Sequence, residues 1–163
     1  MVRPVRPADL PVVLRLLHDL ADYEFEPAAM LGTEEDLRRA LFADQPVVFG
    51  HVAEDPDDGA VVGVAVWHLT FSTWTGRPGI HLVDLVVDAG ARQGGHGREL
   101  VRSLAQLCVE RDYRRLDWEV LDALEDHPGR RGPQGFYRQL GGAPRPGWTG
   151  WRLDGDALRR LGA

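Results

Sequence analysis

Three glycines and two arginines form the segment of the chain best suited to bind a ligand. The segment follows an apolar run that ends at Val87, and it reads Arg92-Gln93-Gly94-Gly95-His96-Gly97-Arg98. A glycine-rich turn between a strand and a helix presents unpaired backbone N–H groups and the positive end of the helix dipole to an anion. The arginines can add charge-assisted hydrogen bonds. The segment therefore predicts a phosphate-binding loop at the start of a helix.

Two common phosphate-binding motifs do not fit this loop. The Rossmann motif needs a glycine three residues after Gly97, where this chain has Leu100. The Walker motif needs a lysine, but all 19 basic residues are arginine, which also excludes Schiff-base catalysis. A plain tight turn between strand and helix remains the alternative interpretation.

The hydrophobic spacing predicts the elements that position the loop. We expect an extended start, an α-helix from Asp9 to about Phe25 with Asp9 as its N-cap, and a second helix that begins at Thr33. The further expected helices are 97–111, 133–140 and one from residue 154, and the expected strands are 47–53, 60–69, 81–87, 116–121 and one around residue 151. Residues 76–79 and 122–132 are expected to be loops. This order predicts an α/β protein whose mixed central sheet has helices on both faces.

Composition limits the possible functions. The 163 residues suit one domain spanning 1–163, and a net charge of −6 disfavours nucleic acid and anionic membranes as partners. No run reaches the roughly 20 apolar residues of a membrane span. The single cysteine and the lack of an apolar leader place the protein in the cytoplasm, and the six histidines lack metal-ligand spacing, so we expect no metal.

Several segments besides the loop resemble one family, the GNAT acetyltransferases, and within it the diamine (spermidine/spermine) acetyltransferase branch. The loop matches that family's R-x-x-G-x-G pattern. The other similar segments are 20–24 (LADYE), 33–37 (TEEDL), 71–77 (FSTWTGR) and 136–143 (FYRQLGGA). The resemblance implies a GNAT fold, acetyl-CoA as co-substrate, and transfer to a primary amine of a small polyamine-like or amino-acid-like molecule in a ternary complex. It also implies a homodimer.

The resemblance further implies roles for individual residues. The loop from Arg92 to Arg98 would hold the diphosphate of acetyl-CoA, and the strand residues Leu85, Val86 and Val87 would hold its pantetheine arm through main-chain groups. Tyr137 would be the acid that protonates the departing thiolate. A core aromatic position is the alternative interpretation of Tyr137.

The chain departs from the branch where an amine would lose its proton. Relatives read Leu-Glu-Asp in the strand where this chain reads Leu82-Val83-Asp84, and an asparagine that follows the next strand in relatives is absent from 120–124. Asp84, which interrupts an apolar strand, is our first candidate to bind the amine or order a water. The further candidates are His81 and Glu119, and each has an ordinary structural role as its alternative.

The wall of the amine site is also suggested by resemblance. Tyr23 and Glu24 stand where the branch closes its amine site, and Trp74 lies in a loop that helps to shape it. An acidic pocket with aromatic walls suits a cation. Because of the lost acid, a non-catalytic acyl-CoA-binding sensor domain is the alternative function, and a protein acetyltransferase with an open peptide groove is a third.

Overall fold

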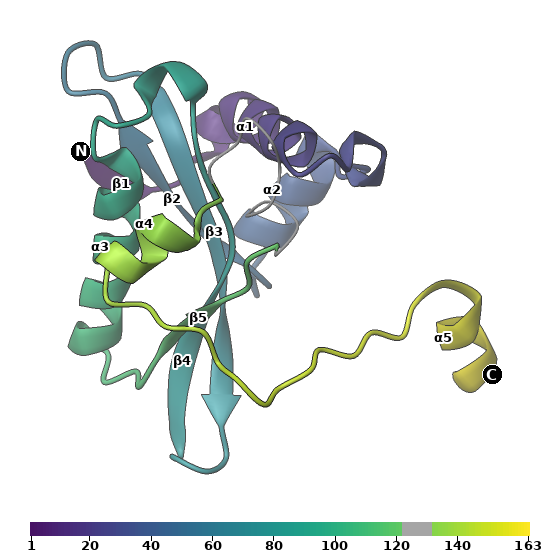
Figure 1. Ribbon diagram of the computed structural model, residues 1–163. Coiled ribbons are helices and arrows are strands. Elements are labelled where there is room, and N and C mark those ends of the chain that lie inside the picture. The colour runs from purple at the N-terminus through teal and green to yellow at the C-terminus, as the bar shows by residue number, and fades with distance from the viewer. Residues whose placement is uncertain (122–131) are drawn as a thin grey trace.

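The computed structural model describes residues 1–121 and 132–163, and a five-stranded sheet forms its centre (Figure 1). The strands lie side by side in the order β1-β2-β3-β4-β5 and span Val2–Pro4, Phe49–Glu54, Val61–Ser72, Arg77–Val87 and Leu116–Trp118. Pairing is antiparallel from β1 to β4, whereas β5 runs parallel to β4. The predicted mixed sheet is thus confirmed.

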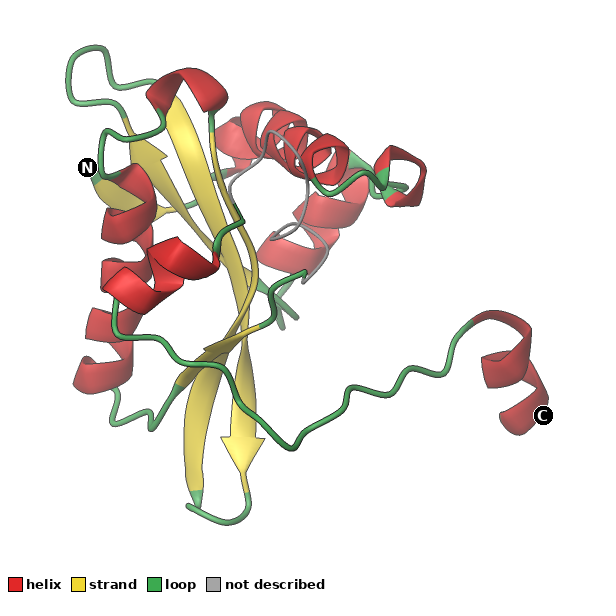
Figure 2. Ribbon diagram, in the orientation of Figure 1, coloured by secondary structure: helices red, strands yellow, loops and turns green. Residues whose placement is uncertain are grey.

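Helices cover both faces of the sheet, as the sequence predicts (Figure 2). The helix α3 (His96–Glu110) packs on one face, while α1 (Leu10–Tyr23) and α2 (Glu34–Phe42) lie on the other. The core under α3 contains Ala65, Trp67, Ile80, Leu82, Leu100 and Leu104, and the core under α1 contains Val13, Leu16, Val52, Val64, Val66 and Val86. Two short helices follow, α4 (Gln134–Gln139) and α5 (Gly155–Leu161). No helix in the described ranges is long and apolar enough to cross a membrane.

The helix α2 begins as predicted. The hydroxyl of Thr33 accepts a hydrogen bond from the Asp36 N–H at 3.2 Å, and the Asp36 carboxylate accepts one from the Thr33 N–H at 3.1 Å. These reciprocal bonds satisfy backbone donors that the first turn of a helix leaves unpaired.

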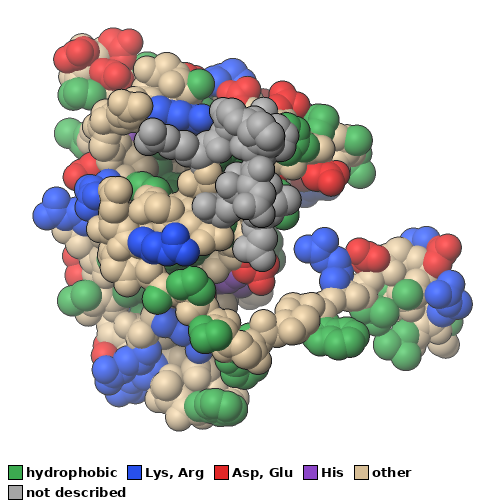
Figure 3. Space-filling view, in the orientation of Figure 1, with side chains coloured by type: hydrophobic (Ala, Val, Ile, Leu, Met, Phe, Trp, Pro, Cys, Tyr) green, Lys and Arg blue, Asp and Glu red, His purple; other side chains and the backbone are tan. Residues whose placement is uncertain are grey.

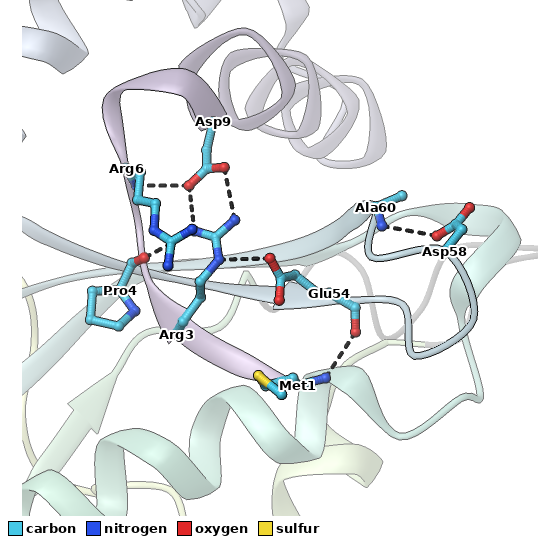
Figure 4. Close-up of polar contacts among 8 residues, drawn as sticks. All are labelled: Met1, Arg3, Pro4, Arg6, Asp9, Glu54, Asp58 and Ala60. Carbon is cyan, nitrogen blue, oxygen red and sulfur yellow. Dashed lines mark hydrogen bonds and ion pairs between the residues drawn. The ribbon is translucent and has the colours of Figure 1, made fainter.

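Asp9 is the N-cap residue of α1, as predicted, but its side chain makes no capping hydrogen bond to that helix. Its buried carboxylate instead accepts two hydrogen bonds from the Arg3 guanidinium, at 2.6 and 3.0 Å, and one from the Arg6 N–H at 2.7 Å (Figure 4). Arg3 also donates from Nε to Glu54 Oε1 at 2.7 Å. Charge-assisted bonds are about twice as strong as neutral ones, so the guanidinium takes the carboxylate that a helix cap would use. These contacts join β1, β2 and the start of α1.

The strands β3 and β4 form a hairpin and extend further toward each other than the predicted strands 60–69 and 81–87. Residues 77–79, expected as loop, pair with residues 70–72 of β3. The turn between them ends at Gly76, whose φ of +62° is one that glycine adopts at little cost. The prediction was wrong because regular cross-strand pairing continues to the turn, which local composition does not reveal.

The strand β4 contains a β-bulge at Val83. Asp84 pairs with Val66 and Leu82 pairs with Trp67, so Val83 has no partner on β3. Parallel pairing of β4 with β5 also stops at this point, because its last pair is Leu82 with Trp118. The bulge therefore explains why β5 is shorter than the predicted strand 116–121, and it leaves the following β4 residues unpaired with β5.

The C-terminal part of the chain contradicts one prediction. No strand forms around Trp151, which is 94% exposed, and the chain runs without regular structure to α5. A strand needs a neighbour to pair with, and this segment extends away from the sheet (Figure 1). The expected loop at 122–132 lies, except for Gly132, outside the described residues.

Candidate active site

The glycine loop has the conformation that the sequence predicts. It leaves β4 through Asp88, whose carboxylate accepts a hydrogen bond from the Gly90 N–H at 2.9 Å, and α3 starts at His96. Gly95 has a φ of +86°, and a Cβ at Gly94 would lie 2.9 Å from His96 Nε2 and 3.2 Å from the Ala91 carbonyl oxygen. The backbone N–H groups of the first turn of α3 are thus available to an anion.

A groove of about 1360 Å³ opens over this loop. It is lined by all the predicted cofactor residues except Gly94: Leu85, Val86, Val87, Arg92, Gln93, Gly95, His96, Gly97 and Arg98. Tyr23 and Tyr137 line it too. The groove follows the part of β4 beyond the bulge, where main-chain groups face away from β3 and are not paired with β5.

Arg15 is a groove residue that the sequence analysis missed. It lies on α1 and reaches Asp88 of the glycine loop at 3.0 Å and Asp19 at 2.7 Å. Only the packing of α1 beside β4 brings it to the groove, so no local signal could have identified it. Arg92 extends across the same groove, with its guanidinium 5.3 Å from the centre of the Tyr23 ring.

The negative charge of Glu24 acts on two groups from other elements, Asp84 of β4 and Tyr137 of α4. Burial, reinforced by the negative charge of Glu24, raises the pKa of Asp84 to about 6. The same two causes, in the same order, raise the pKa of Tyr137 to about 12. Burial also raises the pKa of Glu24, which follows the last residue of α1. The candidate site therefore has two partly buried carboxyl groups and a phenol that keeps its proton at neutral pH.

The bulge decides which residues share a face with Asp84. His81 pairs with His68, and Asp84 pairs with Val66. Positions 66 and 68 of β3 lie on one face of the sheet, so His81 and Asp84 also share that face although they are three residues apart. In an unbulged strand they would point to opposite faces. The rings of His81 and His68 lie 5.0 Å apart.

Two predicted site residues lie apart from this group. Trp74 is 88% exposed in the turn of the β3–β4 hairpin, at the opposite end of β4 from the glycine loop, with its ring 6.5 Å from that of Trp148. Glu119 is exposed one residue beyond β5. The neighbouring Asp117 already pairs with Arg115 at 2.7 Å. In the part of the chain that is described, no cluster of three or more potential metal ligands occurs.

Comparison with known proteins defines the class to which this fold and groove belong. Residues 13–141 match the model of the acetyltransferase (GNAT) family, so the chain belongs to that family and is a GNAT-type N-acetyltransferase. Enzymes of the family use acetyl-CoA as co-substrate.

Curated relatives narrow the comparison. The chain is 29% identical over 170 residues to the thialysine N-epsilon-acetyltransferase of Bos taurus, and the match covers 99% of this chain and 96% of that protein. It is 32% identical over 113 residues to the spermidine/spermine N(1)-acetyltransferase-like protein 1 of Homo sapiens, which covers 66% of this chain and 16% of that protein. These relatives match the diamine acetyltransferase branch.

Solved structures support the fold. An integron cassette protein from Vibrio cholerae superposes with a TM-score of 0.79 at 22% identity, covering 99% of this chain and 96% of that one. At this level of identity the likeness concerns the fold alone.

Proposed function

We propose that the protein acetylates a primary amine of a small, positively charged molecule, with acetyl-CoA in the groove over the glycine loop. The observation that carries the proposal is the groove over the glycine loop, because Tyr137 lines it and Glu24 and Asp84 are next in the chain to its lining residues Tyr23 and Leu85. Of the relatives named above, one is by its name an acetyltransferase of thialysine. The other is named as similar to a spermidine/spermine acetyltransferase. A polyamine-like or basic amino-acid-like amine fits both observations.

The groove residues fit the diphosphate and the pantetheine arm of acetyl-CoA. The free N–H groups at the start of α3, with Arg92 and Arg98, suit the diphosphate. The unpaired edge of β4 at Leu85 and Val87 suits the amide groups of the arm. When bound there, acetyl-CoA supplies the activated acetyl group.

The two carboxyl groups suit the amine. A primary ammonium group with a pKa near 10.4 is about one part in 2,500 neutral at pH 7, so its proton must be removed before the nitrogen can attack. Asp84 and Glu24 would attract the ammonium group, and Asp84, with a pKa of about 6, would accept the proton directly or through a water. The pair would thereby serve in place of the acid that Val83 replaces.

Tyr137 is suited to protonate the leaving group of the reaction. Its pKa of about 12 keeps the phenol protonated, which is the state that a donor needs. As the nitrogen–carbon bond forms and the carbon–sulfur bond breaks, the phenol would give its proton to the departing thiolate, and solvent would restore it.

Titration with acetyl-CoA followed by a thiol-release screen tests the whole proposal. We expect the purified protein to bind acetyl-CoA and to release free thiol with polyamines or basic amino acids, but not with peptides. Binding without release from any small amine would contradict the proposed activity. Lack of binding would contradict the assignment of the groove.

Asp84→Asn tests the proposed base. We expect kcat/KM of the wild type to rise with pH through about 6 as Asp84 ionises, and the variant to lose about 10²-fold in rate and this limb of the profile. Asp112→Asn, at an exposed ion pair with Arg77, is the matched control and should keep the wild-type profile. An unchanged rate in Asp84→Asn would move the role of base to His81 or Glu119, which Glu119→Gln examines next.

We also propose that the protein is a homodimer. The segment after α4 extends away from the body of the molecule (Figure 3). It carries exposed apolar side chains: Trp148, Trp151, Leu153, Leu158 and Leu161. Such side chains are typical of an interface between chains. Size-exclusion chromatography with light scattering should give twice the mass of 18.1 kDa, and a monomer would contradict this proposal. The role of Trp74 and the cytoplasmic location stay predictions.

A further inference from the structure

We propose that Trp118 is a positioning residue that holds the phenol of Tyr137 in place, and this inference rests on the donor role proposed above. Trp118 is the last residue of β5, and Tyr137 lies on α4. Their ring centres are 4.9 Å apart, with an angle of 36° between the ring planes. An aromatic pair at this distance contributes about 0.5–1.5 kcal/mol beyond its burial.

The helix that carries Tyr137 depends on its neighbours. With six residues, α4 is far below the length at which an isolated helix is stable, and none of its residues is fully buried. Phe136 faces α3, because a Cβ at Gly97 would lie 3.5 Å from its Cζ atom. Tyr137 packs on Trp118. These two aromatic side chains therefore fix the helix from two sides.

Gly142 provides a second observation at the same contact. Its N–H donates a hydrogen bond to the Tyr137 carbonyl oxygen at 3.0 Å, in the turn that ends α4. A Cβ at this position would lie 2.7 Å from Cζ2 and 2.9 Å from Cη2 of Trp118. The indole is therefore held between the Tyr137 ring and a turn that has no room for a side chain.

Tyr137 has space to move if this support is lost. It borders the groove on one side and, on another, a cavity of about 350 Å³ that Trp118 and Gly142 also line. A proton donor must come within hydrogen-bond reach of the atom it protonates, and a displacement of about 1 Å can cost about 10²-fold in rate. A change at Trp118 should therefore act on kcat through the position of the phenol.

Steady-state kinetics with the best amine of the screen tests the proposal. We expect Trp118→Leu and Gly142→Ala each to lower kcat about tenfold, while the Kd for acetyl-CoA and the KM for the amine change less than about threefold. Trp118→Phe, which keeps a ring against Tyr137, should restore most of kcat. Leu107→Ala is the matched control, because it removes packing from the core under α3 but lines neither the cavity nor the groove beside Tyr137, and it should keep kcat. If Trp118→Leu does not fold, Gly142→Ala carries the test.

A double-mutant cycle with Tyr137→Phe separates positioning from general loosening. Trp118→Leu should lower kcat in the wild type but hardly at all when the hydroxyl of Tyr137 is missing. The same decrease in both backgrounds would overturn the positioning role. An unchanged kcat in Tyr137→Phe itself would overturn the donor role, and the positioning role with it. A loss in Tyr137→Phe combined with a wild-type kcat in Trp118→Leu would overturn the positioning role alone.

Discussion

Two shielded carboxyl groups in this protein have opposite electrostatic surroundings. The hydrogen-bonded Arg3 guanidinium lowers the pKa of Asp9 below its usual value, against the opposing effect of burial. Burial and the nearby charge of Glu24 raise the pKa of Asp84 to about 6. Arg3 lies 2.6 Å from Asp9, whereas no cation among the described residues forms an ion pair with Asp84. Among the described residues, Asp9 thus has a cationic partner and Asp84 does not.

The difference supports the proposal that Asp9 has a structural role and Asp84 a functional one. A carboxylate removed from water is costly unless a positive charge or hydrogen bonds replace the water. At Asp9 the chain supplies that charge, and the result is a fixed link between β1, β2 and the start of α1. At Asp84 an ammonium group of the substrate would supply it. Perturbed groups of this kind are concentrated at functional sites because their chemistry needs the perturbation.

The largest effect should come from a change at the candidate site that leaves stability untouched. Tyr137→Phe removes a proton donor but keeps the ring against Trp118, so we expect kcat to fall by about 10²–10⁴-fold and the unfolding midpoint in urea to stay unchanged. Tyr113→Phe removes a hydroxyl near the α3 core and serves as control. Loss of stability in parallel with kcat would assign Tyr137 to the core instead.

The next largest effect should fall on stability alone. Asp9→Ala leaves the Arg3 guanidinium, 15% exposed, with one carboxylate partner in place of two, and we expect a loss of about 3 kcal/mol in the free energy of unfolding at pH 7. Because the pKa of Asp9 is lowered in the fold, its contribution is present above the usual pKa of about 4 and is lost as pH falls below it. Urea denaturation at several pH values measures both effects.

Asp19→Ala, at an ion pair whose side chains are about half exposed, is the control for Asp9→Ala and should cost less than about 1 kcal/mol. Equal losses in the two variants would mean that the Arg3 contacts add nothing beyond an ordinary surface ion pair. A decrease of kcat in Asp9→Ala would show that the N-terminal cluster also supports the site.

What the sequence reveals depends on how local the cause is. The N-terminal cap at Thr33 and the glycine loop before α3 are set by residues within a few positions of each other, and both were predicted correctly. The contact of Arg3 with Glu54 could not be predicted, because β1 must first pair with β2 to bring the two residues together. The extent of β4 was missed for the same reason.

The candidate site was predictable in its members but not in its arrangement. Resemblance to a family suggested Tyr137, Glu24 and Asp84, yet no spacing in the chain indicates that α1, β4 and α4 bring them together. The bulge at Val83, which puts His81 on the same face as Asp84, has no sequence signal either. Trp118 was predicted only as part of a strand, because its contact with Tyr137 exists only after β5 and α4 have packed.

The smallest expected effect is the change in stability caused by a substitution at Asp84. It tests the comparison of the two carboxyl groups most directly, because its sign is opposite to that of the change at Asp9. When the fold raises the pKa of a carboxyl group, the folded protein becomes less stable as pH rises. For Asp84 this loss occurs between the pKa in the unfolded chain, near 4, and the pKa in the folded protein, about 6. Asp84→Asn removes that cost, so at pH 8 the variant should be more stable than the wild type by about 2–3 kcal/mol. At pH 4, where Asp84 is already protonated in the fold, the two should have nearly equal free energies of unfolding. If Asp84→Asn is instead less stable at pH 8, a hydrogen-bond or ionic partner must already satisfy the carboxylate, and the site would then offer no unmet charge to a cationic substrate.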